Sequence, residues 1–310
     1  MTIVVAGGTG LAGSAIVRAY QATGAEVIAV NRKVVDLLDR DATTAFLKKT
    51  KPTLVVDAAA KVGGIGANNA FPVEFLSDNV RIQSNLMEAA HAADVGKFIF
   101  LGSSCIYPRD CAQPIKEEYL MTGPLEETNS AYAIAKIAGI ELIKSFRKEY
   151  GRSWISLMPT NLYGPNDNFE LQGSHVLPAF IRRFVEATQN NVATETLWGT
   201  GSPKREFLHV DDLAAAVVHL GGSYNSSNHL NIGSGEDLTI KELAELVAEL
   251  AGFKGEIAWD STKPDGTPRK VLDVSKAKSL GWAPKISLRD GIASTIAWYK
   301  DASAKGVARR

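Results

Sequence analysis

The chain has 310 residues, of which 45% are apolar and 22% are charged, so it can bury a sizeable core. Lys and Arg together number 34 and so do Asp and Glu, and this zero net charge argues against nucleic acid or an acidic membrane as the main partner. No apolar run reaches the ~20 residues that span a bilayer. The two cysteines are too few for a disulfide framework. Because strand-like TIVVA begins at residue 2, we expect no leader, and we predict a soluble, cytoplasmic enzyme or binding protein.

Short apolar strands alternate with amphipathic helices in the first half of the chain. Strands are predicted at residues 2–6, 25–30, 53–59, 97–103 and 153–159, and helices at 13–24, 42–50, 80–96 and 131–151. This alternation predicts a parallel sheet covered on both faces, and several strands lack polar alternation, as buried strands do. The predicted fold class is α/β, with a Rossmann-type doubly wound parallel sheet.

The pattern changes after Tyr163, where a polar loop rich in Gly, Pro and Asn covers residues 161–175. Further on, helices are predicted at 176–189, 239–252 and 287–300, a strand at 255–260, an irregular segment at 198–214, and a frayed basic tail at 302–310. We expect a smaller α/β C-terminal lobe that binds the substrate. The predicted dinucleotide-binding domain is residues 1–165 plus about 203–232, and the substrate-binding lobe is 166–202 and 233–310.

A glycine-rich turn joins the first strand to the first helix. Gly7, Gly10 and Gly13 follow one another at a spacing of three residues, which allows a tight turn, a close approach of the backbone to a pyrophosphate and close packing of helix on strand. The second strand ends at Asn31 and Arg32, where an NAD-dependent protein usually carries an acidic residue. An arginine suits a 2′-phosphate, so the sequence favours NADP(H).

Tyr132 and Lys136 lie at positions i and i+4 of a predicted helix, and therefore on one face. We expect the lysine to lower the pKa of the phenol and to hold a nicotinamide ribose. A serine from the GSS sequence that ends the fourth strand can share the substrate oxygen. Together these groups can move a proton to or from a carbonyl or alcohol oxygen during hydride transfer.

These motifs resemble the extended short-chain dehydrogenase/reductase family, which acts on nucleotide sugars. The resemblance rests on the glycine fingerprint, on GSSCIYP at 102–108 and on YAIAK at 132–136. It implies that the catalytic serine is Ser103, four residues before Tyr107. One departure is Thr9, where some members have an arginine that contacts the adenosine phosphate. Its absence leaves Arg32 as the main residue for the 2′-phosphate.

Longer blocks narrow the resemblance to members that make GDP-L-fucose from GDP-4-keto-6-deoxy-D-mannose. The blocks are AAAKVGGIGANN (58–69), SSCIYP (103–108), MPTNLYGPNDNF (158–169), SHVLPA (174–179), REFLHVDDLA (205–214) and KPDGTPRK (263–270). The implied reaction has two stages, epimerisation at C3 and C5 followed by reduction of the C4 ketone by NADPH. Epimerisation needs a base and an acid on opposite faces of the sugar, and the resemblance implies Cys105 and His175 respectively. Taken alone, Cys105 would be a packed thiol.

The resemblance also implies the binding residues. For the cofactor these are Gly7, Gly10, Leu11, Gly13, Arg32, Ala59, Tyr132, Lys136, Pro159, Asn161, Leu162 and His175. For the GDP-sugar they are Arg183 and Arg205 at the pyrophosphate, Trp198 as a wall or stacking surface, and Lys263, Asp265 and Lys270 at the nucleotide end. Cys111 is expected to be incidental, His209 to be structural, and no metal site is visible. The family pairs subunits through two helices, for which residues 80–95 and 133–150 are the candidates, so we expect a homodimer.

Two alternatives remain open at this point. One is another NADP-dependent nucleotide-sugar 4-reductase or 4-epimerase of the same family, which would not need Cys105 and His175. The other is a redox sensor or scaffold that binds NADP without turnover, for which Ser103, Tyr132 and Lys136 would have no use.

Overall fold

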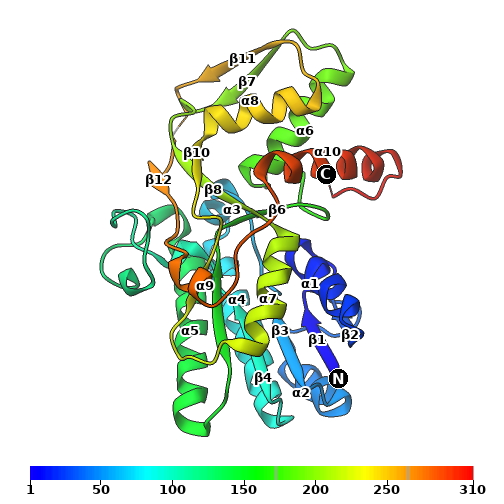
Figure 1. The fold of residues 1–310 in the computed structure, drawn as a ribbon, viewed down its shortest axis with the longest axis vertical. Coiled ribbons are helices and arrows are strands. Elements are labelled where there is room, and N and C mark those ends of the chain that lie inside the picture. The colour runs from blue at the N-terminus through cyan, green and yellow to red at the C-terminus, as the bar shows by residue number, and fades with distance from the viewer. Residues whose placement is uncertain (172, 264, 310) are drawn as a thin grey trace.

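The computed structural model describes residues 1–171, 173–263 and 265–309, and within them it forms two stacked parts (Figure 1). The helices are α1 (Leu11–Ala22), α2 (Arg40–Thr50), α3 (Ile65–Ala70), α4 (Pro72–Ala92), α5 (Ser130–Tyr150), α6 (Val176–Gln189), α7 (Val210–Ser223), α8 (Ile240–Ala251), α9 (Ser275–Ser279) and α10 (Leu288–Ala304). Short 3₁₀ turns are η1 (Ser104–Ile106), η2 (Glu117–Tyr119) and η3 (Glu127–Asn129). The strands are β1 (Thr2–Ala6), β2 (Glu26–Val30), β3 (Leu54–Asp57), β4 (Lys97–Leu101), β5 (Ile155–Pro159), β6 (Asn161–Tyr163), β7 (Thr194–Trp198), β8 (Lys204–His209), β9 (Leu230–Ile232), β10 (Asp237–Thr239), β11 (Glu256–Asp260) and β12 (Arg269–Lys270).

The larger part is built on a six-stranded sheet in the order β2-β1-β3-β4-β5-β9. Every pairing in it is parallel. The chain turns from β1 to β2 on one side and then crosses to β3 on the other, so the order reverses beside β1. Ligands of open α/β sheets bind at the carboxyl ends of the strands at such a point. This confirms the predicted doubly wound α/β class.

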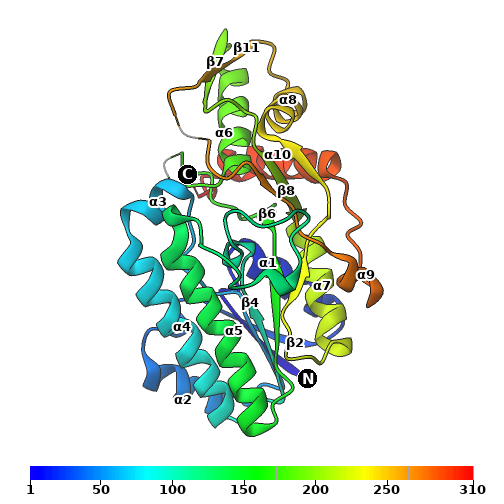
Figure 2. The same ribbon diagram turned by 90° about the vertical axis from the view of Figure 1, so that its left-hand side faces the viewer.

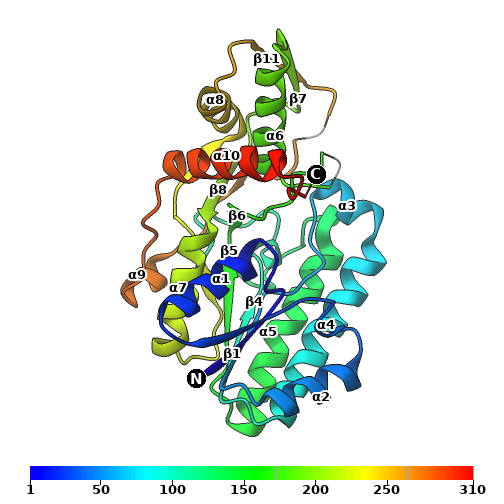
Figure 3. The same ribbon diagram turned by 90° about the vertical axis from the view of Figure 1, so that its right-hand side faces the viewer.

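Helices cover both faces of this sheet. Helices α2, α4 and α5 lie side by side on one face (Figure 2), and α1 and α7 lie on the other (Figure 3). Side chains alternate between the two faces along each strand. In β4, Phe98 and Phe100 join the core under α4 and α5, whereas Ile99 and Leu101 join the core under α1 and α7. Both layers are therefore built from strands that are apolar on each side.

The smaller part packs α6, α8 and α10 around a third core that includes Phe184, Val247 and Tyr299. Its strands form a sheet in which β8 pairs with β10, β12 and β6, and a separate parallel pair of β7 and β11. Strand β6 follows directly after β5, and β8 runs straight into α7, so these segments join the two parts. No helix among the described residues is long and apolar enough to cross a membrane.

Some expectations from the sequence were wrong. The segment 198–214 is not irregular, because Lys204–His209 form β8 and Val210 begins α7, whose first turn His209 caps through Nδ1. The tail is not frayed up to Arg309: α10 continues to Ala304, and Arg309 bridges to Asn168 and accepts a hydrogen bond from the Phe169 N–H at 2.8 Å. The prediction failed because these partners lie far away in the sequence.

Candidate active site

The glycine turn forms a tight cradle between β1 and α1. Gly7 has φ +70°, and a Cβ there would lie 2.6 Å from the carbonyl oxygen of Ala58. A Cβ on Gly13 would overlap the Gly7 carbonyl oxygen, and Gly10 donates to that oxygen at 2.9 Å while it caps α1. Leu11 opens α1, so free N–H groups of the helix face the turn. Because side chains would fill this cradle, it fits a pyrophosphate group at the backbone.

The other predicted cofactor residues lie along the same edge of the sheet. Arg32 is exposed two residues beyond β2. Ala59 follows β3, Pro159 ends β5, and Asn161 and Leu162 belong to β6. The Asn161 amide donates to the Glu206 carbonyl at 2.8 Å, which fixes its orientation.

Ser103 and Tyr132 come together where β4 ends beside α5. Ser103 caps η1, and its Oγ accepts a hydrogen bond from the Cys105 N–H at 3.2 Å. Burial raises the pKa of Tyr132 well above its usual range, nearby Cys105 raises it further, and a hydrogen bond from Ser103 opposes the shift. The net shift is therefore upward, opposite to the lowering expected from Lys136, because burial is the largest cause. The Lys136 Nζ lies 5.9 Å from the Tyr132 ring centroid and donates instead to the Leu101 carbonyl at 2.9 Å.

Sequence reasoning missed Asp57, the last residue of β3. Its side chain is fully buried, and its charge acts on Lys136 and Tyr132. The signal was present in the sequence, since Asp57 is the single charged residue in the apolar run LVVDAAA at 54–60. A carboxyl group at the carboxyl end of a buried parallel strand points to the functional edge.

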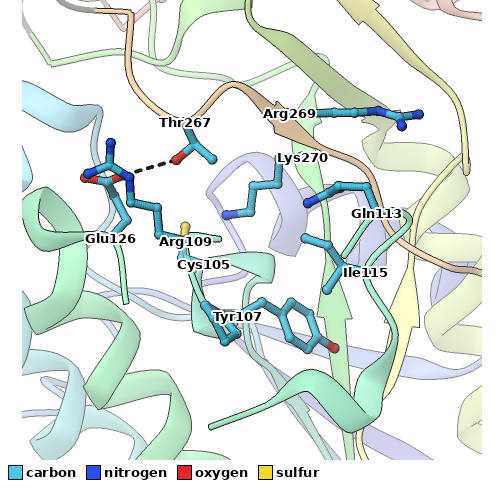
Figure 4. A pocket seen from close by; sticks show the side chains of 10 residues that line it. Cys105, Tyr107, Arg109, Gln113, Ile115, Glu126, Thr267, Arg269 and Lys270 are labelled. Atoms are coloured by element: carbon cyan, nitrogen blue, oxygen red, sulfur yellow. Dashed lines mark hydrogen bonds and ion pairs between the residues drawn. The ribbon is translucent and has the colours of Figure 1, made fainter. Parts of the chain in front are cut away.

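Cys105 is one of the residues that line a small pocket (Figure 4). Its Sγ is 3.6 Å from the amide nitrogen of Asn129, at the end of η3, and it is close enough to Tyr132 and Arg205 to influence the pKa of both. The residues that line the pocket are Cys105, Tyr107, Pro108, Arg109, Gln113, Ile115, Glu126, Thr267, Arg269 and Lys270. The thiol is therefore beside the serine–tyrosine pair and open toward the smaller part.

His175 lies at the N-terminus of α6, where it is the N-cap residue. The loop before it is held by a hydrogen bond of 3.1 Å from the Gly64 N–H to the Gly173 carbonyl. His175 is exposed to solvent on one side. Neighbouring protein groups partly desolvate the ring, and this lowers its pKa. Among the described residues it makes no hydrogen bond to Ser103, Cys105, Tyr132 or Lys136.

Two of the predicted substrate residues lie close to Cys105. Arg205 on β8 is acted on by Cys105, Glu126 and Asp265, each of which raises its pKa against the lowering effect of burial. Lys270 on β12 pairs in register with Arg205 and points into the pocket of Cys105. These two cations therefore extend the site from the thiol into the smaller part.

The other four lie farther out in the smaller part. Asp265 accepts from the Thr200 N–H at 2.8 Å and its hydroxyl at 2.7 Å. The Lys263 Nζ is 5.6 Å from the ring centroid of Trp198, which is 71% exposed. Arg183 is already paired with Glu195 at 2.5 Å and donates to the Thr196 carbonyl at 2.6 Å. The exposed ring of Trp198 can therefore stack on a base. Arg183 could bind a phosphate only while it is also paired with Glu195.

No group of three or more metal-ligating side chains is found in the part of the chain that the structure describes.

The fold and these residues define a nucleotide-dependent oxidoreductase of the α/β class. Residues 3–233 match the model of the NAD dependent epimerase/dehydratase family, and the chain belongs to this family.

Relatives match over almost the whole chain. It is 55% identical over 298 residues to "Putative GDP-L-fucose synthase 2" of Arabidopsis thaliana, covering 96% of this chain and 91% of that protein. It is 49% identical over 307 residues to "GDP-L-fucose synthase" of Escherichia coli strain K12, covering 96% of each. Among solved structures, a GDP-L-fucose synthetase from Naegleria fowleri bound to NADP superposes with a TM-score of 0.91 at 29% identity, over 100% of this chain and 96% of the other.

Proposed function

We propose that this chain is a bifunctional enzyme that converts GDP-4-keto-6-deoxy-D-mannose to GDP-L-fucose with NADP(H) as cofactor. The position of the Cys105 thiol carries the proposal. It lies beside Ser103 and Tyr132, where a simple reductase needs no further proton-transfer group. The relatives named GDP-L-fucose synthase support the same substrate.

For the reduction, NADPH supplies a hydride to C4 of the sugar when it is bound. The glycine cradle holds the pyrophosphate of the cofactor, and Arg32 contacts its 2′-phosphate. Tyr132, assisted by the Ser103 hydroxyl, donates a proton to the C4 oxygen. A high pKa suits this role, because the phenol stays protonated until negative charge develops on that oxygen. Lys136, whose Nζ lies 5.9 Å from the ring centroid of Tyr132, holds the nicotinamide ribose.

For the epimerisations, the same C4 oxygen must carry negative charge while a proton leaves C3 or C5. Ser103 and Tyr132 stabilise this charge by hydrogen bonds. Cys105 removes the proton from one face, and His175 returns one from the other. A neutral His175 would first need to take up a proton from solvent, to which its ring is open.

We assign residues 1–165 and about 203–232 to the dinucleotide-binding domain, and 166–202 with 233–310 to the substrate-binding lobe. The pairing of β9 with β5 and the position of α7 on the sheet support the return of the chain to the first domain. Arg205, on β8 where the two parts join, binds the pyrophosphate, and Arg183 can assist it although it is paired with Glu195. In the lobe, Trp198 stacks on the base or sugar, and Lys263, Asp265 and Lys270 close the nucleotide end.

We further propose a homodimer in the cytoplasm, paired through α4 and α5. These helices pack on each other, and exposed apolar side chains lie on them or next to them, namely Val73 on α4 (76% exposed), Ile134 on α5 (49%) and Phe71 just before α4 (54%). Burying such side chains favours association. Sedimentation of the purified chain tests this, and a monomer at micromolar concentration would contradict it.

The function is tested by one reaction in deuterated water. Purified protein, GDP-4-keto-6-deoxy-D-mannose and NADPH are incubated, and the product is read by mass spectrometry and proton NMR. We expect NADPH consumption with solvent deuterium at both C3 and C5. Consumption without deuterium would instead identify a 4-reductase, and no consumption with intact NADPH binding would favour a non-catalytic NADP-binding protein.

A matched pair of variants assigns the thiol. Cys105→Ser should slow deuterium incorporation by at least about 100-fold, the usual range for a lost proton-transfer group. Cys111→Ser is the control, because Cys111 is also a free, half-buried thiol but does not line the pocket of Cys105. Equal incorporation in the two variants would remove Cys105 from the mechanism.

A further inference from the structure

Asp57 stands on the sheet face that α5 covers. It pairs in register with Ala6 on β1 and with Phe100 on β4, so the three side chains project to the same side. Phe100 belongs to the core under α4 and α5. The Asp57 side chain has 0% exposure, so its carboxyl group is held in that core at the carboxyl end of β3.

Lys136 reaches the same place from α5. Its Nζ lies 4.8 Å from the centroid of the Phe100 ring and donates to the carbonyl of the next residue, Leu101, at 2.9 Å. The ammonium group is therefore above the strand that lies directly beside Asp57. Both side chains are buried, Lys136 with 3% exposure. Two opposite charges are thus buried in the core under α5, the helix that also carries Tyr132.

The hydrogen bonds of Asp57 do not explain its charge. Oδ1 accepts from the Ala59 N–H at 3.1 Å, a turn that asparagine forms equally well. Oδ2 is buried and has no hydrogen-bond partner among the described residues. A buried carboxylate oxygen without a partner is costly unless an opposite charge lies near. A purely structural role at this turn would favour the uncharged amide.

We propose that Asp57 is a positioning residue for the reaction, in which its buried carboxylate is the counter-charge of the Lys136 ammonium. The inference rests on the proposed function, because Lys136 is taken to hold the cofactor ribose. Asp57 contacts neither substrate nor cofactor and acts through the charge state of Lys136.

The electrostatics agree with this geometry. Burial raises the pKa of Asp57 to about 6 while Lys136 opposes the rise, so the carboxyl group is ionised above pH 6. Burial lowers the pKa of Lys136, and Asp57 is the group that opposes the fall. The other titratable groups here are Cys105 after β4 and Tyr132 on α5, with the Ser103 hydroxyl between them. All of them are retained when Asp57 alone is replaced, so a comparison of variants isolates its charge.

The first test is NADPH binding as a function of pH, followed by fluorescence, in the wild type and in Asp57→Asn. We expect the alkaline loss of affinity, which follows deprotonation of Lys136, to begin about one pH unit or more lower in the variant. Between the two midpoints its affinity should be about tenfold weaker. The control is Asp273→Asn, since Asp273 accepts from the N–H two residues later in the same way, far from this cluster. Superimposable pH profiles of Asp57→Asn and wild type would overturn the proposal.

A second measurement tests the proposal even if Asp57→Asn folds poorly. Thermal unfolding of the apo protein is followed between pH 5 and 9 for Lys136→Met and for Asp57→Asn/Lys136→Met. Without the ammonium, the lone carboxylate should make Lys136→Met lose stability as pH rises above 6, and the double variant should lack this loss. Identical pH dependence in both would also overturn the proposal. Neither readout uses the sugar, so failure of the proposed function would appear separately, as NADPH binding without turnover.

Discussion

The buried carboxylate of Glu206 offers a sharp test of how the smaller part is held together. Glu206 on β8 has 0% exposure and accepts hydrogen bonds from two backbone N–H groups, Gly235 at 2.7 Å on Oε1 and Leu272 at 2.9 Å on Oε2. It thereby ties the turn before β10 and the chain after β12 to the strand that carries Arg205. The perturbation is Glu206→Gln, which keeps the shape of the side chain but replaces one accepting oxygen with a donating NH₂.

The magnitude follows from the two N–H partners. A glutamine oxygen satisfies one of them, and its NH₂ then faces the other N–H, which stays buried and unpaired. Such a group costs about 1–3 kcal/mol, and a hydrogen bond to a charged acceptor is lost in addition. We therefore expect the free energy of unfolding to fall by about 2–4 kcal/mol, or the melting temperature by about 4–8 °C. Since β8 and β12 carry Arg205 and Lys270, KM for the GDP-sugar should rise with a smaller change in kcat.

The assay is thermal unfolding at pH 8, with steady-state kinetics on the same samples. Glu245→Gln is the matched control, because Glu245 is an exposed residue of α8 and its change should stay within about 0.5 kcal/mol. Gly233→Ala provides a second perturbation, since its Cβ would overlap Oε1 of Glu206. If Glu206→Gln is as stable as Glu245→Gln, the two N–H bonds do not hold these segments and the reasoning fails.

Three further predictions concern the cofactor site and the acid side of the pH range. Gly13→Ala should weaken NADPH binding by at least about 100-fold, because its Cβ would overlap the Gly7 carbonyl oxygen and displace the cradle. A fluorescence titration that gives near-normal affinity would refute this. Arg32→Ala should reduce the preference for NADPH over NADH by about 10–100-fold, because a charge-assisted contact to the 2′-phosphate is lost. If the ratio of kcat/KM for NADPH to kcat/KM for NADH stays unchanged, Arg32 does not bind the 2′-phosphate. Burial lowers the pKa of His229 to about 4, so the folded state keeps it neutral while the unfolded chain takes up a proton below about pH 6.5. Stability should thus be lost as pH falls from 6.5 toward 4, by about 3 kcal/mol in all. His229→Gln, which can still donate to Tyr107, should flatten that loss in unfolding scans, and an unchanged slope would contradict the assignment.

Much of the fold and site is determined by local sequence. The spacing of Gly7, Gly10 and Gly13 specifies a turn that only residues without a Cβ can form, whatever surrounds it. The i and i+4 positions of Tyr132 and Lys136 place both on one face of α5 by helix geometry alone. Apolar strands alternating with helices lead to a parallel sheet because their two apolar faces must both be covered. These features depend on neighbours within a few residues, so the sequence alone was enough.

Tertiary structure decided which groups meet across the sheet and between its parts. Asp57 faces Lys136 only because β3 pairs with β4 in a register that sets it beside Phe100. Arg183 forms an ion pair with Glu195 because α6 packs beside β7. Arg309, near the C-terminus, forms a β-bridge with Asn168. The register between strands and the packing of helices arise from the whole core, and a shift of one residue in β3 would turn Asp57 to the opposite face of the sheet. The reacting groups could therefore be identified from the sequence, whereas the charged groups around them depend on the tertiary structure.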